Sequence, residues 1–215
     1  MCIQNSPMIL EDTRSGLRAY SIEDDMLRNR QVCLMGPVNE ESVNALVKQL
    51  LYLEQSKPGE EITFYINSGG GEVGNGLVLY DVMKYITSPI KTICVGMAAS
   101  MAAVLFSAGN HRELFRHSRV MIHDPAINGS LRTKALELKS LSEDLMATRE
   151  SLAEILAANT GQELEVIYEK TAVDSFFDAR SAVEFGLADA IIGGEPAAKN
   201  KSSRNNTKTK SKKGE

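Results

Sequence analysis

Two kinds of hydrophobic pattern alternate along the chain. Short runs rich in β-branched residues predict strands, and longer segments with an apolar residue every three or four positions predict helices with one buried face. The predicted strands are 31–35, 62–66, 92–95, 120–123 and 187–192. The predicted helices are a short one beginning at residue 21, then 43–51, 77–86, 100–108, 131–158, 163–170 and 178–186. This alternation favours an α/β domain built on a parallel sheet.

The predicted helix 131–158 is unusually long. It has a leucine at every seventh position, namely Leu131, Leu138, Leu145 and Leu152. At 1.5 Å per residue it would extend about 40 Å, which is more than one domain needs to cover its own sheet. We expect it to project and to pack against a partner through this leucine seam. The alternative is a surface helix that lies on its own sheet.

Composition divides the chain into unequal parts. The 215 residues carry a formal net charge of -4, but residues 199–215 hold seven of the 24 Lys and Arg residues and one of the 28 Asp and Glu residues. This last stretch has no apolar side chain to bury, so nothing offsets its ordering entropy. We expect a partly flexible N-terminal segment (1–20), one domain (21–195) and a disordered basic tail (196–215). The tail is open to three interpretations, which are a solvated extension, a docking segment and a weak polyanion binder.

The sequence offers no pattern for a membrane span, a disulfide framework or a metal site. Cys2, Cys33 and Cys94 are widely spaced and form no Cys/His metal-binding motif. No run approaches the ~18 apolar residues of a membrane span, and the N-terminus lacks the pattern of a signal peptide. We therefore expect a cytoplasmic protein that needs no metal and has neither membranes nor nucleic acids as partners.

Two segments place backbone amides at the start of a predicted helix. Residues 67–71 (NSGGG) follow one predicted strand, and residues 96–101 (GMAASM) follow the next. If these strands are parallel neighbours, both segments lie at the same edge of the sheet. A serine in such a turn, here Ser100, becomes a nucleophile when a general base and two N–H donors converge on it. The alternative role for Ser100 is a helix cap.

A histidine is available as the general base. His123 ends a predicted apolar strand and precedes the turn at Pro125, whereas His111 and His117 lie in a polar stretch and are expected at the surface. A third group must orient the imidazole. Asp124 is a poor candidate, because neighbouring residues on a strand face opposite sides. The residue types alone do not choose among the remaining acidic residues.

The glycine segment has a competing interpretation. Gly69, Gly71 and Gly74 satisfy the G-x-G-x-x-G fingerprint of dinucleotide-binding folds. That fingerprint requires an acidic residue at the end of the following strand, where this chain has residues 95–97 (VGM). No G-x-x-x-x-G-K-[ST] motif occurs either, so we do not expect the chain itself to hydrolyse ATP.

Four motifs follow one another along the chain, namely 65–71 (YINSGGG), 96–101 (GMAASM), 121–125 (MIHDP) and 184–189 (EFGLAD). In sequence and in order they resemble the Clp protease proteolytic subunit (ClpP) family, and the resemblance extends from about Leu17 to Ile192. It implies an α/β fold of the ClpP/crotonase type, a spiral of β-β-α units. The long helix would be the projecting handle helix of that fold.

The same resemblance implies a serine peptidase with a Ser-His-Asp triad. Its nucleophile would be Ser100, its base His123, and its third member Asp174, which precedes the EFGLAD motif. The backbone amides of Gly71 and Met101 would form the oxyanion hole.

Asp178 is the fallback for the third position, although a helix N-cap explains it better. The family needs no metal or other cofactor. It assembles into seven-membered rings stacked in pairs around a closed chamber, and a separate Clp-type ATPase unfoldase feeds polypeptide substrates into that chamber. ATP would thus be used by the partner and not by this chain. Residues 1–20 would correspond to the axial loop of the ring.

The chain departs from the family pattern at Gly69, Glu72, Ala102, Asp124, Ala172 and Val173. At these six positions, taken in the same order, family members usually carry a proline, a small hydroxyl residue, a glycine, a glutamine, an acid and an arginine. The missing arginine predicts weaker coupling between rings. Two alternatives stay open. One is a low-activity paralogue that completes mixed rings with a second ClpP subunit, and the other is a crotonase-type enzyme acting on acyl-CoA thioesters.

Overall fold

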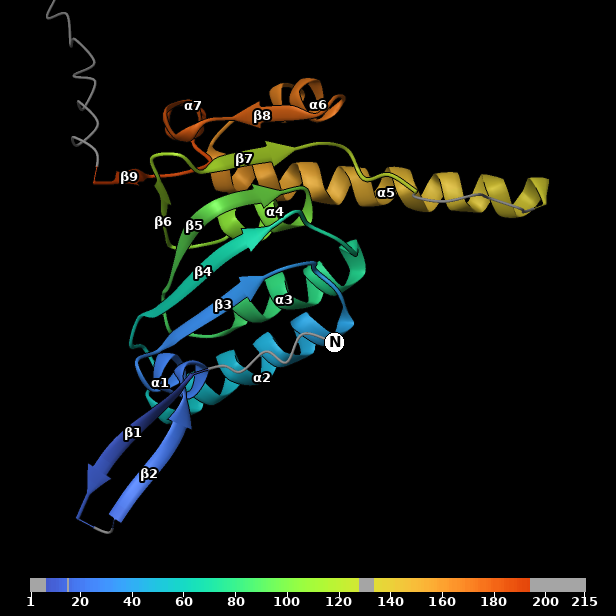
Figure 1. The fold of residues 1–215 in the computed structure, drawn as a ribbon. Coiled ribbons are helices and arrows are strands. Elements are labelled where there is room, and N and C mark those ends of the chain that lie inside the picture. Colours follow the sequence, from blue (N-terminus) through green and yellow to red (C-terminus); the bar gives the residue numbers. More distant parts are fainter. Residues whose placement is uncertain (1–6, 15, 128–133, 194–215) are drawn as a thin grey trace, which may run out of the picture.

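A seven-stranded sheet forms the centre of the protein (Figure 1). The structure is a computed structural model that describes residues 7–14, 16–127 and 134–193. The strands of this sheet are β3 (Gln31–Met35), β4 (Ile62–Ser68), β5 (Ile90–Ala99), β6 (His111–Phe115), β7 (Arg119–Ile122), β8 (Ser175–Phe177) and β9 (Ala190–Ile192). Five of them follow the order β3-β4-β5-β6-β9, while β7 pairs with β5 and β8 pairs with β7. Within this sheet only the pairing of β7 with β8 is antiparallel.

The described residues also form seven helices. They are α1 (Ile22–Arg28), α2 (Glu40–Ser56), α3 (Val73–Tyr85), α4 (Met101–Ser107), α5 (Ala135–Thr160), α6 (Leu164–Thr171) and α7 (Ala179–Phe185). Helices α2 and α3 lie side by side against the sheet (Figure 1), and α4 is buried along its whole length. The largest fully buried side chains include Phe64 on β4, Leu79 on α3 and Phe106 on α4. None of the described helices is long and apolar enough to cross a membrane.

The expected α/β fold with a parallel sheet is confirmed, and each predicted strand and helix has a counterpart. Several boundaries differ by a few residues, since α2, α3 and β5 all begin earlier than predicted, and β9 begins at Ala190 and not at residue 187. The N–H groups of Leu187 and Ala188 instead donate to the carbonyl of Ala182, in the last turn of α7, at 2.9 and 3.2 Å. Hydrogen bonds that close a helix end therefore occupy the first residues of the predicted strand.

The hydrophobic pattern did not reveal every strand. It missed β6, β8 and a hairpin formed by β1 (Met8–Thr13) and β2 (Gly16–Ser21), which extends away from the sheet (Figure 1). Strand β8 has only three residues, and most side chains of the hairpin are exposed, so neither shows a clear alternation of buried and exposed positions. Nearly all of the hairpin lies in the segment 1–20 that was expected to be partly flexible. Residues 1–6 and 15 of that segment lie outside the described residues.

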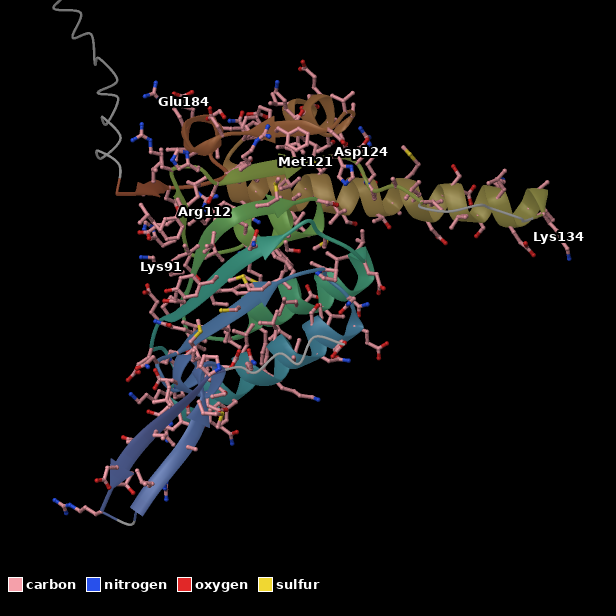
Figure 2. All side chains as sticks on the ribbon, in the orientation of Figure 1. Lys91, Arg112, Met121, Asp124, Lys134 and Glu184 are labelled. Carbon is pink, nitrogen blue, oxygen red and sulfur yellow. The ribbon has the colours of Figure 1, made fainter. Side chains whose placement is uncertain are left out.

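Helix α5 extends beyond the sheet over its N-terminal half (Figure 1), with Lys134 at its outer tip (Figure 2). Leu138 in this half is 51% exposed, whereas Leu152 in the other half is 8% exposed and packs in the protein's own core. The predicted leucine seam is therefore divided between the core and the surface. The expected start of the helix at Leu131, and the predicted basic tail 196–215, lie outside the described residues.

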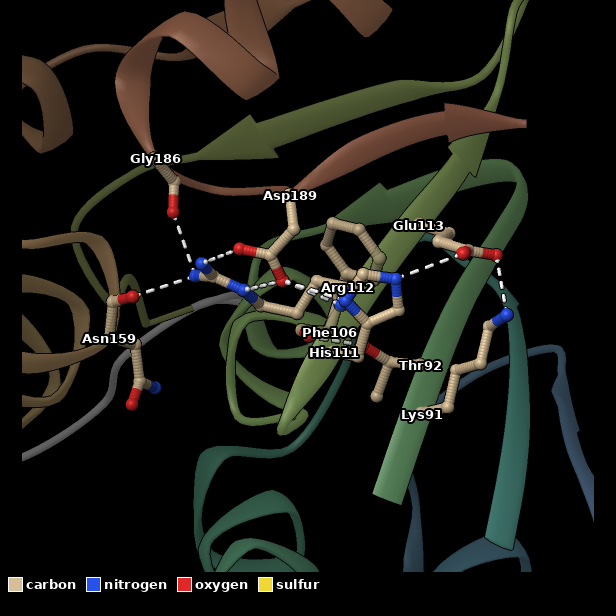
Figure 3. Close-up of polar contacts among 9 residues, drawn as sticks. All are labelled: Lys91, Thr92, Phe106, His111, Arg112, Glu113, Asn159, Gly186 and Asp189. Carbon is tan, nitrogen blue, oxygen red and sulfur yellow. Dashed lines mark hydrogen bonds and ion pairs between the residues drawn. The ribbon is translucent and has the colours of Figure 1, made fainter. Parts of the chain in front are cut away.

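One arginine fastens the C-terminal elements to the sheet. The guanidinium of Arg112 on β6 pairs with the Asp189 carboxylate at 2.6 Å (Figure 3). It also donates to the carbonyl oxygens of Asn159, near the end of α5, and Gly186, at the end of α7, at 2.6 and 2.7 Å. Charge-assisted bonds of this kind are among the stronger ones in proteins. They fix both helix ends beside the strand and so restrain the intervening segment that carries α6 and β8.

Candidate active site

Ser100 occupies a sharp turn between β5 and α4. Its backbone has φ 54° and ψ -125°, and a non-glycine residue with positive φ costs about 1–3 kcal/mol and is often found at functional sites. The Ser100 N–H donates to the carbonyl of Met121 at 2.8 Å, which ties the turn to β7, where Figure 2 labels Met121. A strained strand-to-helix turn carrying a serine is typical of a nucleophile.

The glycine loop after β4 packs directly against this turn. A Cβ added to Gly70 would lie 2.8 Å from Ser100 Cβ and 3.1 Å from the backbone nitrogen of Met101. A Cβ added to Gly71 would lie 2.1 Å from the carbonyl oxygen of Val38. Both positions also have positive φ, at +91° and +154°. Close approach within the chain therefore accounts for these two glycines without a bound dinucleotide.

Among the described residues, two backbone N–H groups of the glycine loop and the serine turn are not used by the surrounding secondary structure. Met101 is the first residue of α4, so its N–H has no acceptor within the helix. The bridge between Val38 and Gly71 uses the N–H groups of Val38 and Glu72, at 2.9 and 2.8 Å, and not that of Gly71. The N–H groups of Gly71 and Met101 are therefore candidate oxyanion donors, in a glycine loop and a serine turn that pack against each other.

His123 lies next to Ser100 because β7 pairs with the end of β5. The parallel register sets Ala99 opposite Met121, so the residues that follow each strand are neighbours. His123 Nε2 is 2.8 Å from Ser100 Oγ, which is hydrogen-bonding distance for transfer of the serine proton. The His123 side chain is 28% exposed, so one side of the imidazole remains accessible to solvent.

Asp174 reaches the other nitrogen of the imidazole. Its Oδ1 is 3.2 Å from His123 Nδ1. The antiparallel pairing of β7 with β8 sets Ile122 opposite Ser175, and the next residues outward are His123 and Asp174. The Asp174 side chain is 62% exposed. A chain of polar contacts therefore joins Asp174, His123 and Ser100, the three side chains of the predicted triad.

A comparison with protein-family models matches residues 14–195 to the family described as Clp protease. The match covers well over half of the chain. The chain belongs to the Clp protease family. The predicted resemblance, which rested on four short motifs, is thereby confirmed over nearly the whole described structure.

The two other aspartates considered for the triad have different partners in this Clp protease chain. Asp124, which Figure 2 labels just beyond β7, accepts a hydrogen bond from Arg149 Nε at 2.6 Å. Asp178 is the N-cap of α7 and accepts from the N–H of Ser181 at 2.8 Å, as predicted. Hydrogen bonds from Ser181 lower the pKa of the Asp178 carboxyl below its ordinary value.

A small cavity of about 20 Å³ opens beside Ser100 and His123. Its walls come mainly from apolar side chains of α4 and α5, with Arg149, Asp124 and Thr171 as polar members. No sequence signal pointed to either Arg149 or Thr171, because Arg149 occupies an ordinary position in a predicted helix and Thr171 directly follows the helix predicted at 163–170. Among the described residues, no group of three or more His, Cys, Asp or Glu side chains is placed to hold a metal ion.

Proposed function

We propose that the protein is a serine endopeptidase that hydrolyses peptide bonds of unfolded polypeptides. The observation that carries this proposal is the continuous polar contact from Asp174 through His123 to Ser100, with distances of 3.2 and 2.8 Å. Ser100 is the nucleophile, His123 the general base and acid, and Asp174 the group that orients the imidazole. The amides of Gly71 and Met101 donate to the oxyanion.

The geometry supports an acyl-enzyme mechanism. Ser100 Oγ bonds to the carbonyl carbon of the scissile peptide as His123 Nε2 removes the hydroxyl proton. The tetrahedral intermediate collapses, the C–N bond breaks, and His123 returns the proton to the leaving amine. A water molecule then attacks the ester while His123 accepts its proton. Release of the new carboxyl product restores the Ser100 hydroxyl.

Donors for the oxyanion stabilise both tetrahedral intermediates. Backbone N–H groups suit this role because the fold fixes them before the reaction, so little reorganisation accompanies charge development. The close packing of the glycine loop against the Ser100 turn supports assigning Gly71 and Met101 to it. The cost of losing one such donor is about 10²–10³ in kcat.

For the assembled state, we propose seven-membered rings stacked in pairs, which work with a Clp-type ATPase unfoldase. Membership of the Clp protease family supports this assembly. So does the outer half of α5, where Leu136 and Leu138 are 82% and 51% exposed. A helix that presents large apolar side chains beyond its own sheet suits the handle that would join two rings. The hairpin β1–β2 would lie at the ring axis, and ATP would be consumed by the partner alone.

Active-site labelling tests the peptidase proposal. A small fluorophosphonate should add to Ser100 in the wild-type protein, as located by mass spectrometry of the digested chain. Ser100→Ala should take up no label and lose about 10⁴-fold or more of its peptide hydrolysis, because the covalent route is gone. The control is Ser151→Ala, which removes another hydroxyl, exposed on α5, and should label normally.

Labelling also separates the rival functions. A protein that takes no label, alone or mixed with a second ClpP subunit, would contradict the proposal and favour a structural role in mixed rings. Hydrolysis of acyl-CoA thioesters without any peptide hydrolysis would favour the crotonase alternative.

A further inference from the structure

The cavity beside Ser100 is narrow and closed on most sides. Its volume of about 20 Å³ is close to the space of one water molecule. Val104, Leu152 and Leu156 form apolar walls and are themselves at most 8% exposed, so they are held by the core. Because the nucleophile and the base both line it, this cavity is where the side chain beside the attacked carbonyl would fit.

A second hollow shares one lining residue, Arg149, with the small cavity. It has a volume of about 570 Å³ and is bounded by α5 and by Tyr168 of α6. Among the described residues, Arg149 is the one that lines both the small cavity and this larger hollow. Arg149 therefore borders both a space that fits a methyl or hydroxyl group and a space that fits a long side chain, and we refer to its side chain as the partition.

Two contacts hold this partition in place. Arg149 Nε donates to Asp124 Oδ2 at 2.6 Å, and the guanidinium carbon lies 4.2 Å from the centre of the Tyr168 ring. Asp124 is itself fixed, because its N–H donates to the carbonyl of Thr171 at 2.7 Å. The ion pair is only partly exposed, with side chains 26% and 29% accessible, so water screens it less than a surface pair. Charge-assisted and cation–π contacts together oppose rotation of the arginine.

Thr171 adds a polar point to the small cavity. The residue is 3% exposed and lines the cavity, and its Oγ1 has no hydrogen-bond partner among the described residues. A buried hydroxyl without a partner is unfavourable by about 1–3 kcal/mol. A ligand that brings a small polar group, such as the hydroxyl of a serine side chain, could supply the missing hydrogen bond.

We propose that Arg149 determines specificity by limiting the length of the substrate side chain accepted beside Ser100. The inference rests on the proposed peptidase function and goes further by naming the substrate class. The protein cleaves the peptide bond after a residue with a short side chain, alanine or serine, because a longer side chain would collide with the Arg149–Asp124 pair. Removing the partition joins the two spaces and admits long side chains such as leucine or phenylalanine.

The test uses the full chain and a series of peptidyl diphenyl phosphonates. These probes phosphonylate an active serine with loss of phenol, and they differ only in the side chain next to phosphorus, which mimics alanine, serine, leucine or phenylalanine. For the wild type, second-order rate constants should be at least about 10-fold higher for the two short probes. Arg149→Ala should raise the rates of the two long probes by about 10-fold or more. The readout is the ratio of the long-probe to the alanine-probe rate constant within each protein, so a general change in the reactivity of Ser100 does not alter the conclusion.

Two further variants separate the loss of the partition from a general change in surface charge. Asp124→Asn keeps the arginine but removes its charged anchor, so it should shift the preference in the same direction by a smaller factor. Glu154→Ala removes a charge from an exposed position of α5 that lines neither space, and it should keep the wild-type preference.

The outcomes separate this inference from the proposed function. Wild-type protein that prefers the long probes, or Arg149→Ala with an unchanged preference, would overturn the role of Arg149 while leaving the serine chemistry intact. Labelling by the small fluorophosphonate but by none of the peptidyl probes would show that the cavity does not accept the side chain. A protein that no probe labels would remove the peptidase proposal and this inference together.

Discussion

Changing Asp174 to asparagine tests whether this exposed carboxylate orients the imidazole of His123. The substitution keeps the shape of the side chain and removes its charge. An amide NH₂ facing Nδ1 would favour the tautomer with the proton on Nε2, and that tautomer cannot accept the proton of Ser100. The structure supplies the two quantities that set the size of the effect, which are a distance of 3.2 Å and an exposed fraction of 62% for the Asp174 side chain.

The expected loss is smaller than for a buried triad. At 3.2 Å a charge pair is worth about 1 kcal/mol in water and about 5 kcal/mol at an effective dielectric constant of 20. Because more than half of the Asp174 side chain is accessible, we take the lower part of this range, about 1.5–3 kcal/mol. This corresponds to a fall of about 10- to 150-fold in kcat/KM. A buried triad aspartate, by comparison, contributes about 10⁴-fold.

The assay is hydrolysis of a fluorogenic peptide, with fluorophosphonate labelling as a second readout. Asp178→Asn is the matched control, since it makes the same change four positions away, where asparagine can still cap α7. Its kcat/KM should stay within about twofold of the wild type, because Asp178 contacts Ser181 and not the imidazole. Equal losses in both variants, or a larger loss for Asp178→Asn, would refute the assignment of Asp174.

Two further predictions concern assembly and pH. Wild-type protein should sediment as rings, and Leu138→Glu on the exposed half of α5 should weaken pairing of rings; wild-type protein that stays monomeric at high concentration would contradict the proposed assembly. Hydrogen bonds from Ser88 and Thr87 lower the pKa of Glu54 from 4.5 to about 2. Ionised Glu54 therefore stabilises the fold above its unfolded pKa of about 4.5, and this contribution disappears as the pH falls towards 2. In Glu54→Gln, the urea concentration at the unfolding midpoint should fall less steeply between about pH 5 and pH 3 than it does in the wild type. An unchanged slope would contradict the stabilising role of ionised Glu54.

Several features of the site followed from short stretches of sequence. The turn at Ser100 is signalled by a β-branched run, a small-residue segment and a helix, all within about ten residues. The cap at Asp178 and the stop at Gly186 depend on hydrogen bonds and dihedral angles within one helix. Local patterns of this kind are predictable because the interacting groups are also neighbours in the chain.

The pairing of β7 with β8 was not predictable in the same way. Strand β8 has three residues, too few for a hydrophobic period, yet its register brings Asp174 to His123 from 51 positions along the chain. Only the resemblance to a family pointed to Asp174. Hydrophobic periodicity reports which face of an element is buried, and it carries no information about which distant element pairs with it.

By itself the sequence determined the alternation of strands and helices, the helix caps, and the positions of the serine and histidine at the ends of strands. Only the tertiary structure decided which acid meets His123, why Gly70 and Gly71 must lack a side chain, and that Arg149 lines both the small cavity and the larger hollow. The physical reason is that the first set depends on backbone preferences and side-chain patterns over a few residues. The second depends on distances between segments that meet only when the sheet and α5 have packed together.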